Sequence, residues 1–295
     1  MKSLKEFTFL NKECGFFTAA FFMFYKVNLR IANFGFNIKR KKRRKEKLEK
    51  ISSALLILKH NRTPVNGKDY LKLVHNNTTV FLRPYSSDAD VFYQVIKGEG
   101  YKCVVEIYDQ FFKQSAKSII DCGLNVGLAA VYLGQHYPHA FVLGVEPFKD
   151  NLETARLNLQ ANGINSFELL EGGIWNENGS LVINRDFRDG KEWSITLEKS
   201  ATGKGDIQAY SILDIVNKVP GVVDILKIDI EGAEKNLFAD KEYAKNFLSK
   251  VKCMAIEIHD EFHCRESIYE SLTASNFFYY NTNDLTLAIN RSYIS

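Results

Sequence analysis

The sequence predicts an α/β protein with a mostly parallel seven-stranded sheet that ends in an antiparallel hairpin. From residue 118 onward, short apolar runs alternate with helical stretches, the pattern of a parallel sheet covered by helices on both faces. The last two apolar runs, 277–281 and 285–290, lie close together and predict the hairpin. Apolar content of 45% and charged content of 25% are typical of globular proteins, which excludes a fibrous or wholly disordered chain.

Each element of the sheet region is predicted from its local pattern. The other predicted strands are 119–122, 141–145, 167–170, 181–184, 222–228 and 251–258. The predicted helices are 126–136, 150–162, 212–218, 233–248 and 267–274. In such a sheet, ligands bind outside the carboxyl ends of the strands, so the residues directly after each strand are the candidate functional residues.

Three regions are predicted along the chain. Residues 1–50 form an extension, residues 51–110 form a cap, and residues 111–295 form the domain that contains the sheet. Ser86, Ser87 and Asp88 predict a helix start, because short polar side chains satisfy the free backbone amides there. In the cap we predict a helix at 51–59, a hairpin formed by 70–73 and 78–83, and a second helix at 89–97.

Charge divides the chain into two unlike parts. Residues 1–50 hold 14 basic and 4 acidic side chains, a net charge of +10, whereas residues 51–295 hold 25 basic and 31 acidic side chains, a net charge of −6. The first part contains an uncharged, aromatic-rich run at 14–25 and a polybasic run at 39–50. The apolar run is shorter than the about 20 residues that a bilayer span needs. It also lacks the cleavage site of a signal peptide, so we expect an extension with helical character and no export.

Three interpretations of residues 14–50 stay open. An apolar segment followed by basic residues suits peripheral contact with an anionic membrane surface. The same pattern suits a helix packed on its own domain, followed by a solvated basic helix. A nucleic-acid partner is not favoured, because a basic run without a recognition module shows only the electrostatic part of such a site. The oligomeric state is not predicted.

Cysteine usage indicates a reducing compartment. The five cysteines are an odd number and form no CxxC pair, so neither a disulfide framework nor a cysteine-rich zinc site is expected. We therefore expect a cytoplasmic protein, with the inner membrane surface as the alternative that residues 14–50 suggest.

A glycine loop follows the first predicted strand of the sheet. In DCGLNVG (121–127), Gly123 and Gly127 let the backbone approach a ligand, and the next helix presents its amino end. The loop is not a dinucleotide fingerprint, because GxGxxG from Gly123 would need glycine at Asn125 and Leu128. Glu146 ends the second strand, where a carboxylate binds ribose hydroxyls. The combination indicates S-adenosylmethionine, with its amino-acid part at the glycine loop and its ribose at Glu146.

A second cluster, DILKIDIEGAE (224–234), places Lys227, Asp229 and Glu231 at alternate positions around the end of the strand predicted at 222–228. Together with DCGLNVG, Glu146-Pro147 and LRPYSSDADVF (82–92), it resembles the FkbM family of S-adenosylmethionine-dependent methyltransferases. The resemblance covers roughly residues 80–290, and KIDIEGAE is its most specific part. It departs at Leu124, where the family usually has alanine, a change that leaves the loop glycines in place.

The resemblance implies a Rossmann-like class I methyltransferase domain over 111–295 and transfer of a methyl group to a hydroxyl of a sugar, glycan or secondary metabolite. The residues it implies for the methionine part of the cofactor are Asp121, Gly123, Asn125 and Gly127. Glu146 then takes the ribose, and fold position puts the adenine near Gly173, Ile174 and Trp175. The cap helix over 89–97, with Tyr101, is expected to close over the cofactor.

Methylation of a hydroxyl is an in-line displacement that needs a base for the alcohol proton. Asp229 and Glu231 are candidates, and so is His259, because an imidazole titrates nearer neutral pH than an ordinary carboxylate. These three residues could instead share Mg²⁺ or Mn²⁺, but their spacing is not peculiar to a metal site, so no metal is favoured. Lys227 and Glu234 are expected to form a plain ion pair.

Two other functions stay open. Methylation of nitrogen in RNA or a small amine is disfavoured, because no Asn-Pro-Pro-Tyr-like motif follows the strand predicted at 222–228. The chain could also be a non-catalytic, membrane-tethered binding module. In the enzyme interpretation, the polar loop over 185–205 forms a lid for the acceptor, with Trp193 or Trp175 on a sugar ring. Packing is the default role for either tryptophan.

Overall fold

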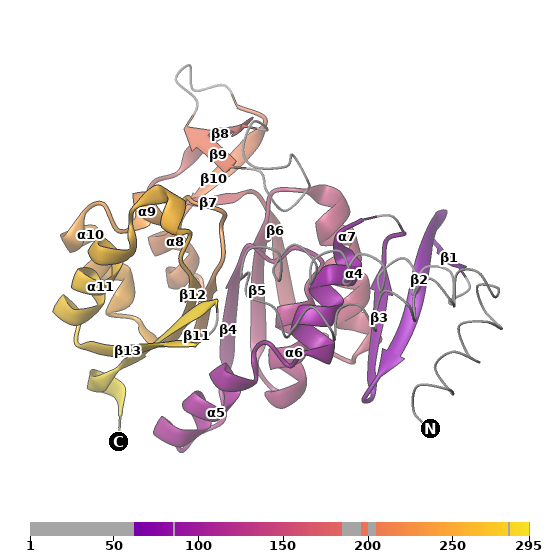
Figure 1. The fold of residues 1–295 in the computed structure, drawn as a ribbon, viewed down its shortest axis with the longest axis horizontal. Coiled ribbons are helices and arrows are strands. Elements are labelled where there is room, and N and C mark those ends of the chain that lie inside the picture. The colour runs from indigo at the N-terminus through magenta and orange to yellow at the C-terminus, as the bar shows by residue number, and fades with distance from the viewer. Residues whose placement is uncertain (1–61, 85, 185–195, 200–204, 283, 295) are drawn as a thin grey trace, which may run out of the picture. The chain divides into compact units, whose positions relative to one another are not determined.

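The computed structural model describes residues 62–84, 86–184, 196–199, 205–282 and 284–294 (Figure 1). The predicted extension over 1–50, the helix at 51–59 and Trp193 lie outside these residues. Among the helices that are described, none is long and apolar enough to cross a membrane.

The chain divides into two compact units. In the first, β1 (Arg62–Val65) pairs antiparallel with the start of β2 (Lys68–His75). Asn66 and Gly67 form their turn with φ of 52° and 77°, the left-handed conformation that suits an Asn-Gly hairpin. In the same unit, the buried carboxylate of Asp88 pairs with Arg83 at 2.7 Å. The predicted boundaries at residues 50 and 110 stay predictions.

The second unit holds a seven-stranded sheet in the order β13-β14-β12-β11-β4-β5-β6. The five strands from β12 to β6 run parallel, and β14 pairs antiparallel with both β12 and β13. The predicted α/β sheet with its closing hairpin is thus confirmed. Its strands are β4 (Ser118–Cys122), β5 (Phe141–Glu146), β6 (Phe167–Glu171), β11 (Val223–Ile228), β12 (Val251–Glu257), β13 (Phe277–Thr282) and β14 (Leu285–Asn290).

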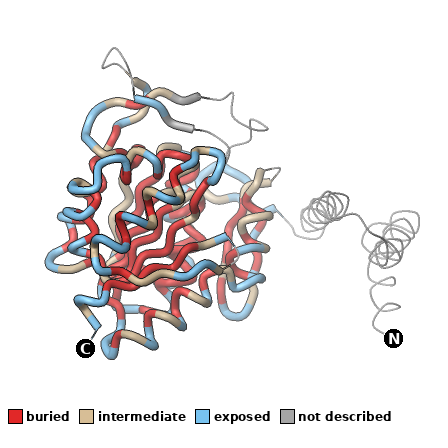
Figure 2. Tube along the Cα trace, turned by 60° about the vertical axis from the view of Figure 1, so that its left-hand side comes forward, coloured by how far each residue is buried: buried red, intermediate tan, exposed pale blue. Residues whose placement is uncertain are grey.

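Helices cover the sheet and bury its strands (Figure 2). Ile120, Leu226 and Met254 project to one face, where they pack with Ile215 and Phe247. Their strand neighbours project to the opposite face by alternation and are also buried, so both faces are covered. The helices of this unit include α5 (Lys102–Phe111), α6 (Leu128–His136), α7 (Lys149–Ala161), α8 (Ile212–Asn217), α10 (Lys241–Leu248) and α11 (Arg265–Ala274).

The helix predicted over 233–248 is in fact two helices, α9 (Glu234–Leu237) and α10. Asp240 separates them, because its carboxylate accepts hydrogen bonds from the backbone N–H groups of Glu242 at 2.9 Å and Tyr243 at 3.2 Å. This is the bonding of a helix N-cap, which starts a new helix. The helix predicted over 89–97 is present as α4 (Asp88–Val91) followed by a π-helix over Phe92–Lys97, whereas helix α5 was not predicted.

A second sheet, in the order β7-β10-β8-β9, lies beside the main one (Figure 1). Strand β8 (Gly179–Asn184) covers the strand predicted at 181–184, and β7 (Gly173–Trp175) pairs in parallel with β10 (Ile207–Ser211). Strand β9 (Thr196–Lys199) falls inside the segment predicted to be a loop, so that prediction is wrong for these residues.

Candidate active site

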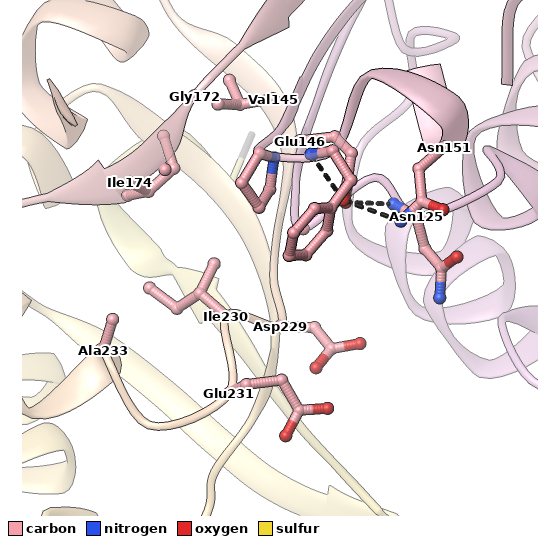
Figure 3. Close-up of a pocket in the computed structure, with 14 residues that line it drawn as sticks. Asn125, Val145, Glu146, Asn151, Gly172, Ile174, Asp229, Ile230, Glu231 and Ala233 are labelled. Atoms are coloured by element: carbon pink, nitrogen blue, oxygen red, sulfur yellow. Dashed lines mark hydrogen bonds between the residues drawn. The ribbon is translucent and has the colours of Figure 1, made fainter. Parts of the chain in front are cut away.

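An open pocket of about 690 Å³ lies at the carboxyl ends of β4, β5 and β11 (Figure 3). This is the edge at which a parallel sheet is expected to bind its ligand. Fourteen residues line it: Gly123, Asn125, Val145, Glu146, Pro147, Phe148, Asn151, Gly172, Gly173, Ile174, Asp229, Ile230, Glu231 and Ala233. The predicted cofactor residues Gly123, Asn125, Glu146, Gly173 and Ile174 are thus brought together with Asp229 and Glu231.

The loop after β4 is in direct contact with the turn after β11. Gly123 has a φ of +81°, and a Cβ added to it would lie 1.8 Å from the carbonyl oxygen of Asp229. The backbone N–H of Asp229 in turn donates to the carbonyl of Cys122 at 3.0 Å. Only glycine fits position 123, because both its backbone conformation and its neighbour exclude a side chain.

Gly127 is explained by helix packing. It precedes α6 with a φ of +77°, and an added Cβ would lie 2.9 Å from the Cβ of Ala155 in α7. Among the described residues, the pocket lining does not include Gly127. Because Gly127 has no side chain, α6 and α7 can pack closely next to the loop.

Glu146 presents an oriented carboxylate to the pocket. Its Oε2 accepts a hydrogen bond from the backbone N–H of Asn125 at 2.8 Å. Its Oε1 accepts from the backbone N–H of Phe148 at 3.2 Å and from Nδ2 of Asn151 at 2.8 Å. Burial raises the pKa of Glu146, while these hydrogen bonds favour its ionised form and oppose that rise. The side chain is held in place as an acceptor.

Asp121 faces a buried lysine. Its Oδ1 lies 2.8 Å from Nζ of Lys227, and its side chain is fully buried, so among the described residues it is outside the pocket lining. Burial raises the pKa of Asp121, with the charge of Lys227 acting in the opposite direction. For Lys227, burial disfavours the charge, but Asp121 and other neighbours outweigh it and raise its pKa. The expected ion pair of Lys227 with Glu234 does not form in the described structure.

His259 is clamped between two carboxylates. Its Nδ1 lies 3.0 Å from Oε1 of Glu234 and its Nε2 lies 3.3 Å from Oε2 of Glu231. Glu234 is fully buried and also accepts a hydrogen bond from the backbone N–H of Ile230. Burial disfavours the imidazolium, but the hydrogen bond that Nδ1 donates to Glu234 and the charges of both glutamates raise the pKa of His259 to about 9. The histidine therefore carries a proton at neutral pH.

The same region contains two titratable groups that were not predicted as catalytic. Glu257 ends β12, and burial together with the charges of Asp229 and Glu231 raises its pKa to about 8. The phenol of Tyr101 is buried near Lys227, and burial raises its pKa. Glu257 reads in the sequence as the polar end of an apolar strand, and nothing local marks it as a member of this site.

Asp229, Glu231 and His259 are the candidate metal ligands. One ligand atom from each lies within 4.8 Å of the others. Carboxylates and imidazole are suitable ligands for Mg²⁺ or Mn²⁺. Both ring nitrogens of His259, however, lie at hydrogen-bonding or ion-pair distance from glutamates, so the geometry does not favour a metal over an imidazolium.

The residues expected near adenine separate into two groups. Gly173 and Ile174 line the pocket, whereas Trp175 packs with Leu181 and Ala209 of the second sheet and lies outside the described lining. Sequence reasoning missed Asn151, Phe148, Ile230 and Ala233 as lining residues. Asn151 is a helix residue five positions after Glu146, so only its hydrogen bond to the carboxylate reveals it.

The sheet order with its C-terminal hairpin and the pocket at the strand ends are those of the class I methyltransferase fold. The family model described as the methyltransferase FkbM domain matches residues 121–279, and the chain belongs to this family.

Individual relatives are more distant. Over 139 residues, the chain is 22% identical to "Methyltransferase 1" of Beauveria bassiana, a match that covers 40% of this chain and 56% of that protein. Over 138 residues, it is 28% identical to "Release factor glutamine methyltransferase" of Aliivibrio fischeri, covering 44% of this chain and 46% of that protein. The chain thus spans about half the length of the curated relatives it matches.

Among solved structures, an O-methyltransferase from Bacillus cereus in complex with SAH is similar to this chain. It is 14% identical with a TM-score of 0.40, and the match covers 65% of this chain and 80% of that chain.

Proposed function

We propose that this methyltransferase acts on oxygen, transferring the methyl group of S-adenosylmethionine to a hydroxyl of a sugar, glycan or secondary metabolite. The observation that carries the proposal is that one pocket contains two kinds of carboxylate. Glu146 is buried and fixed by hydrogen bonds, whereas Asp229 and Glu231 are partly exposed, with side-chain exposures of 29% and 25%. The first suits recognition of a cofactor and the others suit contact with an acceptor.

The residues present fit the cofactor. A carboxylate whose orientation is fixed and which keeps an acceptor position on Oε2 suits a ribose hydroxyl, and Glu146 is held in that way. Ile174, Val145 and Ile230 supply apolar wall suited to an adenine ring. When bound, S-adenosylmethionine supplies an electrophilic methyl group, and the protein's part is to position the acceptor and remove its proton.

Asp229 and Glu231 are the groups placed to receive that proton. Both line the pocket on the turn after β11, and Figure 3 shows their carboxylates next to each other. His259 contributes through Glu231, since its ring lies 3.3 Å from Oε2 and its other nitrogen is bound by Glu234. In this proposal, His259 fixes and balances the charge of Glu231, while a carboxylate takes the proton.

The test uses cofactor with a labelled methyl group and fractionated extract of the source organism. The protein is incubated with each fraction, and the labelled product is identified by mass spectrometry and by its stability to acid and base. A labelled methyl ether on a carbohydrate or metabolite supports the proposal. Label on a nitrogen of RNA or of an amine would support the alternative, and no S-adenosylhomocysteine binding by calorimetry would point to a non-catalytic module.

The proposed setting is the cytoplasm, with residues 14–50 determining location. Those residues lie outside the described part of the chain, so the proposal rests on their sequence pattern. Deletion of residues 1–50 should reduce sedimentation with anionic vesicles and leave binding of S-adenosylhomocysteine unchanged. Equal sedimentation of the full chain and the deletion variant would remove the membrane part of the proposal.

A further inference from the structure

We propose that Lys227 is a positioning residue that locks the cofactor loop, residues 123–127, to the segment that carries Asp229. This inference rests on the proposed function, because it gives the two segments their roles in one reaction. It concerns a side chain that lies outside the described lining of the pocket and has been given no role so far.

Three groups from two segments, the end of β4 with its loop and the turn after β11, converge on the ammonium of Lys227. Its Nζ lies 2.8 Å from Oδ1 of Asp121 at the end of β4, and it donates to the carbonyl oxygen of Gly123 in the loop at 2.7 Å. It also lies 3.7 Å from Oδ2 of Asp229, within ion-pair range. The residue is only 3% exposed. A lysine is almost never buried to this extent unless its charge is compensated, and here the compensating groups come from the end of β4, its loop and the turn after β11.

Stability alone is a weak explanation for this arrangement. A buried ion pair loses hydration on both partners, and replacing it by apolar side chains is often neutral or stabilising. Lys227 also uses one of its donors on a backbone carbonyl of the loop. That bond fixes the orientation of the peptide that follows Gly123, which a simple charge pair with Asp121 would not require.

The contact between Gly123 and Asp229 makes the lock effective. The backbone oxygen of Asp229 occupies the space where a side chain of residue 123 would lie. The two segments therefore cannot shift independently, and Lys227 contacts both of them, at Gly123 and at Asp229. A small displacement of reacting groups lowers the rate of a displacement reaction strongly, so a fixed distance between cofactor loop and acceptor carboxylate has a direct use.

The other end of the same strand offers a matched control. Asp224 at the start of β11 is 4% exposed and pairs with Lys252 at 2.7 Å. Its carboxylate also accepts bonds from the hydroxyl of Tyr108 and the backbone N–H of Lys117. This second ion pair lies at the end of β11 away from the pocket, so its loss should lower stability without affecting the cofactor.

The experiment compares two charge-neutral double variants, D121N/K227M and D224N/K252M. Binding of S-adenosylhomocysteine is measured by calorimetry below the unfolding temperature, with the folded fraction determined by circular dichroism. We expect D121N/K227M to bind about tenfold more weakly or worse per folded molecule, since a charge-assisted bond to the loop is lost. D224N/K252M should bind as the wild type does, even where its unfolding temperature is lower.

The single variant Lys227→Arg covers the case in which D121N/K227M does not fold. Arginine keeps a cation for Asp121, but its donors have a fixed planar fork and do not reproduce the contacts of an ammonium. We expect it to fold and to bind at least about threefold more weakly.

Wild-type affinity in folded D121N/K227M, or in Lys227→Arg where the double variant is unfolded, would overturn the positioning role. Weakening of equal size in D224N/K252M would overturn it too. Lack of binding by the wild type itself would instead overturn the proposed function, and this inference with it.

Discussion

The backbone N–H of Asn125 donates a hydrogen bond of 2.8 Å to Oε2 of Glu146, so the ends of two neighbouring strands share one carboxylate. From the described residues, Oε2 accepts this bond alone, whereas Oε1 accepts two. A carboxylate oxygen can accept two hydrogen bonds. The geometry therefore leaves one acceptor position on Oε2 for a ligand hydroxyl, while the loop that carries Asn125 is held by the same atom.

Glu146→Gln should weaken binding of S-adenosylhomocysteine by about tenfold or more. The substitution replaces a charged carboxylate, in which both oxygens accept hydrogen bonds, by a neutral amide in which one oxygen accepts and the NH₂ group donates. Isothermal titration calorimetry measures the change. Glu171→Gln is the control, since Glu171 is the register partner of Glu146 on β6 but is exposed. Equal affinities for the two variants would contradict the assignment of Glu146.

Gly123→Ala should unfold the protein or destabilise it by on the order of 4 kcal/mol or more, since the new Cβ would overlap the carbonyl of Asp229. Gly163→Ala provides a comparison at a similar backbone angle, with φ of +74° against +81° and no atom within 4 Å of the added Cβ. It should cost only the conformational strain, about 1 kcal/mol. Chemical denaturation gives both values, and similar losses would mean that the contact is unimportant.

His259→Gln should destabilise the protein at mildly acidic pH and have a shrinking effect as pH rises. The pKa of His259 is raised in the folded state from 6.5 to about 9, so the charged histidine contributes stability that is present below about pH 6.5 and lost as pH rises through about 9. Thermal unfolding of wild type and variant at pH 6 and pH 9.5 tests this. The exposed His139→Gln is the control, and a difference that grows with pH would refute the prediction.

Glu257→Gln should stabilise the protein at pH 8 and change little at pH 4.5. The pKa of Glu257 is raised in the folded state from 4.5 to about 8, so folding becomes less favourable as pH rises through this interval. A neutral amide removes that cost. Unfolding temperatures across the interval, compared with those of the exposed Glu266→Gln, give the test. A variant that is less stable than wild type at pH 8 would show that the ionised carboxylate of Glu257 does not destabilise the folded state.

Removal of divalent cations should leave cofactor binding and methyl transfer unchanged. The reason is that both nitrogens of His259 already face glutamates, at 3.0 and 3.3 Å. The purified protein is dialysed against a chelator and assayed with and without added Mg²⁺ or Mn²⁺. Activity that disappears on dialysis and returns with either ion would show that Asp229, Glu231 and His259 bind a metal.

Much of the fold could be predicted because each strand of the main sheet has a recognisable local pattern of apolar residues. The apolar runs that became β4, β5, β11 and β12 are continuous and buried on both faces, which distinguishes them from their surroundings. The second sheet was predicted only in part, since β8 was predicted as a strand but the partners of β8 were not. Its parallel pair joins Gly173–Trp175 to Ile207–Ser211, a partnership between short segments that are distant in the sequence. The break before α10 depended on the hydrogen bonds of Asp240.

The candidate site divides in a similar way. Gly123 and Glu146 were found because their positions after consecutive strands have a direct physical meaning. The contacts of His259 with two glutamates could not be predicted, because one of them is made by Glu234, which lies in helix α9 and contacts Nδ1. The inward position of Asp121 likewise follows from Lys227 on another strand. Sequence spacing selects which residues gather at the sheet edge, whereas cross-strand contacts decide which of them face the pocket.

The parallel pairing of β7 with β10 also bears on how this enzyme could diversify. Gly173 and Ile174 belong to the pocket, and β8 and β9, which lie between β7 and β10 in the sequence, complete the same small sheet. Asn184 and Thr196 are register partners in the β8–β9 pair, so residues inserted between them would lengthen a connection whose ends are already held together. Doubling the length of a closed loop costs only about 0.6 kcal/mol. Evolution can therefore vary the length of the sequence between Asn184 and Thr196 without moving the strand that carries Gly173 and Ile174.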